Sequence, residues 1–235
     1  PAERRHFLDS ELCQLDKVYL YQLSNYNKVV LQRNKLLKEL YLHPDYREVL
    51  DVLDMQLVQY GSALIHRRQT FAEELGKIVH RIHSQLSGGQ EEMELKYEPN
   101  VTVDAFAQML FANRERDMRL KTTATGPHRD DISFVVNGVD IRKFGSQGQQ
   151  RTAALSLKLS EIELVKRLIG DTPVLLLDDV LSELDSGRQN YLLNSIENIQ
   201  TLITCTGLDE FVNHRFSINR IYKVTDGSVT VENKQ

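Results

Sequence analysis

An apolar run that ends in two adjacent carboxylates is the segment of this sequence best suited to chemistry. Val174–Leu177 leads directly into Asp178 and Asp179. In nucleotide hydrolases, a buried strand delivers one such carboxylate to the Mg²⁺ that bridges the β- and γ-phosphates. The residue after it accepts a proton from the attacking water or orients that water. The alternative interpretation is that both aspartates only cap the segment that follows.

A serine and a glycine before a predicted helix form a second candidate site. The segment Phe144–Arg151 reads FGSQGQQR and places Ser146 and Gly148 where the helix begins. A helix N-terminus carries unpaired N–H groups and a partial positive charge, which suit a γ-phosphate. Ser146 also suits an ordinary helix N-cap, and most Ser-Gly loops before helices have only that role.

The order of these segments favours the chemical interpretation. The helix that opens at Ser146 leads into the strand that ends at Asp178, and Ser182–Asp185 follows at once. ABC-type ATPases have the same order of signature motif, helix, Walker B motif and D-loop. The sequence therefore predicts part of an ATPase lobe.

The first third of the chain is predicted to be helical. Apolar residues recur at steps of three and four over Phe7–Tyr41, and again over Leu50–Ile82 in a coiled-coil-like seam that Arg67 interrupts. A proline-containing break at His43–Asp45 separates the two runs, and Ser87–Gly89 ends the second. Two long helices with a short turn between them predict an antiparallel helical hairpin.

The rest of the chain alternates between predicted strands and helices. Strands are expected at Met93–Tyr97, Ile132–Val136, Val139–Ile141, Pro173–Leu177 (buried) and Thr201–Cys205, and hairpin turns at Asn137-Gly138 and Asp226-Gly227. Helices are expected at Val103–Leu120, from the Gly145–Gly148 loop to Ile169, and at Ser186–Ile196. This pattern predicts an α/β fold with a partly parallel sheet, an ABC-type half-lobe, joined to an α-helical hairpin arm. We place the boundary near Leu120, between an arm domain (1–120) and the ATPase part (121–235).

The composition points to a reduced intracellular protein. The 235 residues carry a formal charge of −4, which neither requires nor excludes nucleic acid as a partner. Cys13 and Cys205 lie far apart with no metal-like spacing. No apolar run approaches the roughly 18 residues that a membrane span needs. We expect a soluble cytoplasmic protein without a membrane partner.

Several segments together resemble the RecF family of DNA-repair ATPases. The block Gly126–Asp131 (GPHRDD) carries the most specific resemblance. Pro1–Asp9, Tyr26–Leu37 and Ser182–Asp185 are also similar to that family, so the resemblance covers essentially the whole chain. ATPases of the structural-maintenance-of-chromosomes type share the signature and Walker B motifs, but their coiled coils are far longer.

The resemblance implies an ATP site between two subunits arranged head-to-tail. Ser146 and Gly148 would then contact the γ-phosphate of ATP held by the other subunit, while Gln149 and Arg151 would support their loop. Asp185 in the D-loop would lie at the dimer interface. The γ-phosphate contact would stabilise the dimer only while that phosphate is present.

The resemblance also implies roles for the paired carboxylates. Asp178 would hold Mg²⁺, directly or through water. Asp179 stands where ABC-type ATPases usually have Glu and would act as the general base. Because Asp reaches less far than Glu, slow hydrolysis is expected.

Two features depart from the ABC pattern. No GxxxxGK[ST] loop occurs, and the Gly76-Lys77 pair falls inside a predicted helix. Since the sequence begins in the middle of a family motif, we expect the Walker A portion to be absent or to lie on another chain. The segment Thr204–Gly207 lacks the switch histidine of ABC transporters, and a threonine is the candidate substitute.

Members of the RecF family bind DNA at boundaries of single and double strands and cooperate with RecR and RecO in loading RecA. Candidate phosphate contacts are Arg67, Arg68, Arg114, Arg116 and Arg119. Further basic residues that could contact phosphates are Arg4, Arg5, Lys28, Arg33, Lys35, Lys38, Lys77, Arg81 and Lys121. The alternative is a solvated helix face whose charge is diluted by nearby acids. His128 and Arg129 either bind DNA or pair with Asp130 or Asp131.

The leading hypothesis is an ATP-gated DNA clamp with weak ATPase activity in recombinational repair. A second hypothesis is that this chain alone is a catalytically silent binding module. A chromosome-organising or transporter-type ABC subunit is a third, but the short arm argues against the former and the missing switch histidine against the latter.

Overall fold

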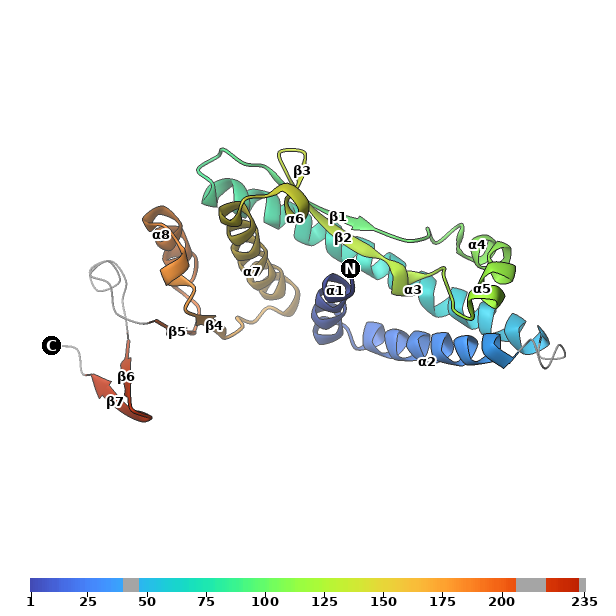
Figure 1. Ribbon diagram of the computed structural model, residues 1–235. Helices are drawn as coiled ribbons and strands as arrows, with labels where there is room; N and C mark the ends of the chain where they lie inside the picture. Colours follow the sequence, from blue (N-terminus) through green and yellow to red (C-terminus); the bar gives the residue numbers. More distant parts are fainter. Residues whose placement is uncertain (40–46, 206–218, 233–235) are drawn as a thin grey trace. The chain divides into compact units, whose positions relative to one another are not determined.

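The chain forms two compact units, Pro1–Asp171 and Thr172–Gln235, in a computed structural model (Figure 1). The structure describes residues 1–39, 47–205 and 219–232. Among the described helices, none combines the length and the apolar character that a membrane span requires.

The first unit begins with three helices. These are α1 (Ala2–Leu15), α2 (Lys17–Glu39) and α3 (Arg47–Leu86) (Figure 1). Two ion pairs show that α2 and α3 run in opposite directions: Asp16, which precedes α2, pairs with Arg67 in the middle of α3, and Arg33 late in α2 pairs with Asp54 early in α3 at 2.6 Å. The predicted antiparallel hairpin is therefore confirmed. The predicted break at His43–Asp45 lies outside the described residues.

The helix predicted over Phe7–Tyr41 is interrupted at Asp16. This residue has an extended backbone, with φ −140° and ψ 104°. Its carboxylate accepts hydrogen bonds from the backbone N–H groups of Val18 (2.8 Å) and Tyr19 (3.2 Å) and so caps the start of α2. The apolar repeat continues past Asp16, so the sequence alone does not distinguish a capping aspartate from one inside a continuous helix. The hydrogen bonds of Asp16 show that the helix breaks there.

The seam of α3 differs from the prediction by one position. Arg67 has an exposed side chain, whereas Arg68 is buried. Steps of three and four from Leu64 reach Phe71 through either residue, so the repeat alone does not choose between them. Arg68 takes the buried position because it has acidic partners there.

An antiparallel sheet in the order β1-β2-β3 packs with the helices of the first unit. Its strands are β1 (Met93–Glu98), β2 (Asp131–Val136) and β3 (Val139–Asp140), and the predicted Asn137-Gly138 turn joins the last two. Between β1 and β2 lie α4 (Phe106–Ala112), α5 (Arg114–Leu120) and the 3-10 turn Pro127–Arg129. The single helix predicted over Val103–Leu120 is thus two helices, which meet at Asn113. The Asn113 side chain donates a hydrogen bond to the Thr125 hydroxyl.

The boundary expected near Leu120 falls inside the first unit. β1 precedes Leu120 and β2 follows it, yet the two strands pair along their full lengths, from Met93↔Val136 to Glu98↔Asp131. The chain then forms α6 (Ile141–Phe144), which replaces the end of the predicted return strand, and α7 (Gln147–Ile169).

The second unit contains the parallel strands that the sequence predicted. β4 (Leu175–Asp178) pairs with β5 (Thr201–Thr204), with α8 (Ser186–Ser195) between them in sequence. β6 (Ile221–Thr225) and β7 (Ser228–Glu232) form a separate hairpin at Asp226-Gly227. The prediction of a fully buried β4 is wrong for this unit: Val174 and Leu176 are exposed, because among the described residues β4 pairs only with β5.

Candidate functional site

The start of α7 is fixed by a reciprocal pair of hydrogen bonds. The Ser146 hydroxyl accepts from the backbone N–H of Gln149 at 3.2 Å, and the Gln149 side-chain oxygen accepts from the backbone N–H of Ser146 at 2.9 Å. This capping box satisfies two of the unpaired donors at the helix start. Ser146 is therefore an N-cap, as the alternative interpretation of the sequence had it.

The capping box leaves donors available at the same helix end. In the part of the chain that the structure describes, the backbone N–H groups of Gln147 and Gly148 have no hydrogen-bond partner. Ser146, Gly148 and Arg151 are exposed on the first turn. Two free N–H groups and the positive end of a helix of this length form a surface that attracts an anion.

A second layer of contacts holds the capping box from α3. The Gln149 side-chain nitrogen donates to Glu91 Oε1 at 2.9 Å. Glu91 Oε2 bonds His83 Nε2 at 3.1 Å, and His83 Nδ1 bonds the Ser156 hydroxyl at 2.9 Å. Since His83 is fully buried at the end of α3, Glu91 connects the long arm helix to the loop at Ser146. Sequence reasoning missed Glu91 because nothing in its neighbourhood marks it.

The two carboxylates at the end of β4 share Thr204 of β5 as a neighbour. The Thr204 hydroxyl donates to Asp178 Oδ1. The backbone N–H of Asp179 donates to the Thr204 carbonyl and hydroxyl oxygens, each at 3.1 Å. Asp179 has φ +51°, which is uncommon for a residue other than glycine and turns the chain sharply after the strand.

The geometry at Asp178 and Asp179 gives little support to a capping role. Within the described residues, neither carboxylate accepts a hydrogen bond from the segment that follows. The contact to that segment instead uses the Asp179 carbonyl oxygen, which accepts from the Ser182 hydroxyl at 2.8 Å. Both side chains are exposed and open to a ligand.

Asp185 begins α8 as its N-cap. Its carboxylate accepts from the backbone N–H of Arg188 at 3.1 Å and forms an ion pair with the Arg188 guanidinium at 2.9 Å. The Arg188 backbone hydrogen bond lowers the pKa of Asp185. The Asp185 side chain remains exposed.

The GPHRDD block forms buried contacts to the helices. His128 Nδ1 bonds the Tyr26 hydroxyl at 2.7 Å and His128 Nε2 bonds the Thr123 carbonyl oxygen at 3.0 Å. Burial lowers the pKa of His128 to about 4, so the ring is neutral at pH 7. Because a carbonyl only accepts, Nε2 carries the proton and Nδ1 accepts from Tyr26. The pairing predicted for His128 with Asp130 or Asp131 is therefore wrong.

The two aspartates of the block pair with arginines from α1 and α3. Asp130 accepts from Arg68 at 3.0 Å, and Asp131 from Arg4 at 2.7 Å. Arg68 also bonds Asp9 at 2.8 Å, the Tyr19 hydroxyl at 2.9 Å and the Pro127 carbonyl oxygen at 2.7 Å. With its side chain 2% exposed, Arg68 has no surface to offer to a phosphate, which corrects its inclusion among the DNA contacts.

The other candidate arginines differ in how their charge is used. Arg114 pairs with Asp51 at 2.5 Å and Asp54 at 2.7 Å, and its guanidinium lies 4.8 Å from the centre of the Phe111 ring. Arg67 pairs with Asp16. Arg116 and Arg119 are exposed on α5 and have no ion pair within the described residues.

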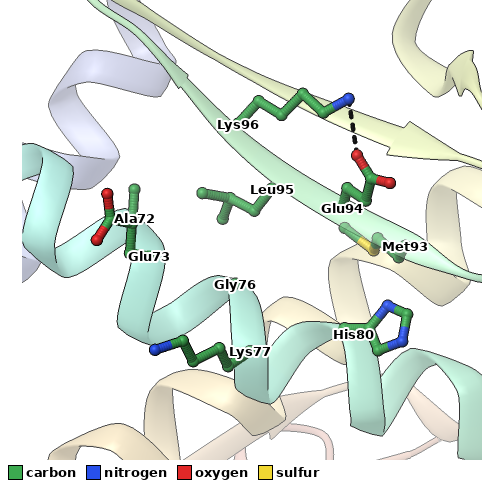
Figure 2. Close-up of a pocket in the computed structure, with 9 residues that line it drawn as sticks. All are labelled: Ala72, Glu73, Gly76, Lys77, His80, Met93, Glu94, Leu95 and Lys96. Atoms are coloured by element: carbon green, nitrogen blue, oxygen red, sulfur yellow. Dashed lines mark ion pairs between the residues drawn. The ribbon is translucent and has the colours of Figure 1, made fainter.

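A surface hollow lies between α3 and β1, and no residue of the two motif segments lines it (Figure 2). Its volume is about 510 Å³, and Gly76, Lys77 and Leu95 are among its lining residues. This is the Gly-Lys pair noted in the sequence. Because Gly76 and Lys77 lie inside α3, their N–H groups serve the helix and cannot cradle a phosphate. Among the described residues, no cluster of His, Cys, Asp and Glu has the size of a protein-only metal site.

Comparisons with known proteins agree with these motifs. No family model matches the chain. The chain is 59% identical over 235 residues to the DNA replication and repair protein RecF of Lachnospira eligens, and 59% identical over 231 residues to that of Agathobacter rectalis. The alignments cover 99% and 98% of this chain but 65% and 64% of those proteins, so the chain spans less than two thirds of their length.

Solved structures give the same result for the fold. A structure of the recombination mediator protein RecF with ATP, from the RecFOR pathway, matches 99% of this chain and 63% of its own, with a TM-score of 0.86 and 33% identity. An Smc head domain from Pyrococcus furiosus matches with a TM-score of 0.53 at 13% identity, a likeness of fold alone. The motifs, the mixed α/β fold with its parallel strand pair, and the identity agree: over nearly its whole length the chain is similar to part of the proteins named RecF.

Proposed function

We propose that this chain supplies the signature side of an ATP site that is completed between two subunits of a RecF-type protein. The exposed start of α7 carries the proposal: its capping box leaves the N–H groups of Gln147 and Gly148 free for an anion. In this role Ser146 and Gly148 contact the γ-phosphate of ATP bound by the partner subunit. Gln149, held by Glu91, keeps their loop in place, and Arg151 supports it from the first turn.

The residues at the end of β4 suit a nucleotide-bound Mg²⁺. Nucleotide sites hold this ion with one or two carboxylates together with phosphate oxygens and water, and Asp178 is an exposed carboxylate oriented by the Thr204 hydroxyl. When bound, Mg²⁺ neutralises charge on the β- and γ-phosphates. Asp179 accepts a proton from the attacking water, and its short side chain makes hydrolysis slow. Asp185 lies at the subunit interface.

The whole protein is then an ATP-gated mediator of recombinational repair. The relatives' name, DNA replication and repair protein, and the RecFOR pathway of the solved structure support this assignment. The protein dimerises on ATP, binds DNA at boundaries of single and double strands, and helps RecO and RecR to load RecA in the cytoplasm.

Substitution of Ser146 tests the composite site. In the complete protein that carries this chain, Ser146→Arg fills the space before α7 and should abolish ATP-dependent dimerisation, measured by analytical ultracentrifugation. Binding of ATP to the isolated subunit should remain, because that site uses other residues. Ser10→Arg, at an exposed position of α1, adds the same side chain as a control. A variant that still dimerises on ATP, or one that no longer binds ATP at all, would contradict the role in trans.

A further inference from the structure

Lysines recur along one exposed face of α2. Lys17, Lys28, Lys35 and Lys38 are all exposed, whereas the opposite side of the helix, including Tyr19 and Tyr26, is buried. At about 100° per residue these lysines fall within an arc of roughly 80°. They therefore form a single ridge, which we call the α2 lysine face.

The charge of this face is not compensated. Glu39, at the C-terminal end, is the only acidic residue of α2. The other cation of the helix, Arg33, is buried and bonded to Asp54 and Asp117. Within the described residues, no ion pair involves the lysines of the face. Since the chain as a whole carries a charge of −4, this is a local concentration of positive charge.

Several basic residues of the neighbouring helices behave differently. Arg67 and Arg81 of α3 pair with Asp16 and Glu163, and Arg114 of α5 pairs with Asp51. These arginines belong to the protein's own ion pairs, so their charge is largely used. Arg116 and Arg119 of α5 are likewise exposed without an ion pair among the described residues, but the α2 lysine face gathers four such side chains along a single helix.

Side chains between the lysines extend the same surface. Ser24 and Asn27 are exposed polar residues, and Tyr21 is 63% exposed. Hydroxyl and amide groups of this kind commonly bond phosphate oxygens beside lysines. Leu31, 70% exposed, adds an apolar contact next to Lys28 and Lys35.

We propose that the α2 lysine face binds the phosphate backbone of double-stranded DNA. The inference rests on the proposed function, because it assigns that function's DNA surface. From Lys17 to Lys38 the helix extends about 32 Å, at about 1.5 Å per residue. One turn of duplex DNA measures about 34 Å, so the face matches a turn of the backbone. Contacts of this kind do not read bases, and binding is salt-sensitive and independent of sequence.

Neutralisation of the face tests the assignment. In the complete protein with ATP, Lys28→Gln/Lys35→Gln should weaken binding to a duplex of about 30 base pairs and lower the slope of log Kd against log salt by about 1.8, at about 0.9 for each phosphate contact. Lys77→Gln/Lys223→Gln, which removes two exposed lysines outside the face, is the matched control and should keep the slope. Lys28→Arg/Lys35→Arg should bind like the unsubstituted protein.

The possible outcomes separate this inference from the proposed function. If the unsubstituted protein binds DNA and both Gln variants keep its slope, the α2 lysine face is not the DNA surface, while the proposed function stands. If the unsubstituted protein binds no DNA, the proposed function fails and the inference fails with it. A Lys28→Gln/Lys35→Gln variant that loses binding to phosphatidylserine vesicles but keeps DNA binding would identify a membrane surface and overturn the assignment.

Discussion

At the scale of single residues, two adjacent arginines of α3 have opposite environments. Arg68 is buried between Asp9 and Asp130, and its removal leaves both carboxylates without the cation that pairs with them. Arg68→Gln should therefore lower the free energy of unfolding by about 3–5 kcal/mol, as for other buried pairs that lose one member. The exposed pair of Arg67 with Asp16 is worth less than about 1 kcal/mol, so Arg67→Gln should have little effect. Urea unfolding of both variants provides the measurement. Equal losses of unfolding free energy in the two variants would show that burial does not determine how much Arg68 contributes to stability.

His128 makes stability depend on pH with a defined sign. Burial lowers its pKa from 6.5 to about 4 in the folded chain, so between these values the unfolded chain binds more protons. Stability contributed by the neutral ring is thus complete above pH 6.5 and is lost as the pH falls toward 4. At about 1.4 kcal/mol per pH unit, the loss from pH 7 to pH 5 is about 2 kcal/mol.

A variant without this ring isolates its contribution. His128→Gln should show a smaller loss of stability between pH 7 and pH 5 than the unsubstituted chain. Glu161, whose pKa burial raises to about 7, contributes with the opposite sign, because its stabilisation is lost as the pH rises. Since Glu161 is present in both proteins, it cancels from the comparison. The same pH slope in both proteins would mean that His128 is not buried as a neutral ring.

At the scale of elements, α3 is shaped by two glycines with different surroundings. A methyl group at Gly61 would lie 2.5 Å from a ring carbon of Phe106 and 2.9 Å from one of Tyr26. At Gly76 the nearest atom is the Leu95 carbonyl oxygen at 3.6 Å, an ordinary contact beside the hollow of Figure 2. Gly61→Ala should therefore destabilise the chain by about 1–3 kcal/mol through overpacking. Gly76→Ala should be neutral or stabilise it by up to about 1 kcal/mol through helix propensity.

Thermal unfolding of the two alanine variants compares the same substitution in one helix. The expected signs are opposite, because helix propensity is common to both positions and only the packing differs. A gain in stability at Gly61 would indicate that Phe106 and Tyr26 move away without cost.

The elements were predictable from sequence wherever their cause was local. Periodic apolar residues predicted the helical hairpin, and Asn137-Gly138 predicted the turn between β2 and β3. Position 68 was not predictable in this way, since the partners of Arg68 lie on α1 and beside β2, far away in the sequence. The link from Glu91 to Gln149 spans 58 residues and has the same character. Long-range pairs of this kind leave no periodic signal in a single sequence.

At the scale of the whole molecule, the motif residues belong to different compact units. Ser146–Arg151 lies on the first unit and Asp178–Asp185 on the second. In the proposed function the two segments serve ATP in different ways: the former responds to the γ-phosphate, while the latter holds Mg²⁺ and activates water. A substitution that blocks hydrolysis should therefore leave dimerisation intact, whereas one at Ser146 should not.

Asp179→Asn separates hydrolysis from dimerisation. The amide keeps the size of the side chain but accepts a proton far less readily, so the complete protein should bind ATP, dimerise and then fail to hydrolyse it. The dimer should persist on ATP for much longer than in the unsubstituted protein, because the γ-phosphate contact is not removed. Rates of phosphate release and of dimer dissociation after removal of free ATP provide the measurement. Thr204→Ser, which keeps the hydroxyl beside Asp178, is a control and should retain hydrolysis. Normal hydrolysis by Asp179→Asn would exclude Asp179 as the general base and leave Asp178 with the only carboxylate role at the end of β4.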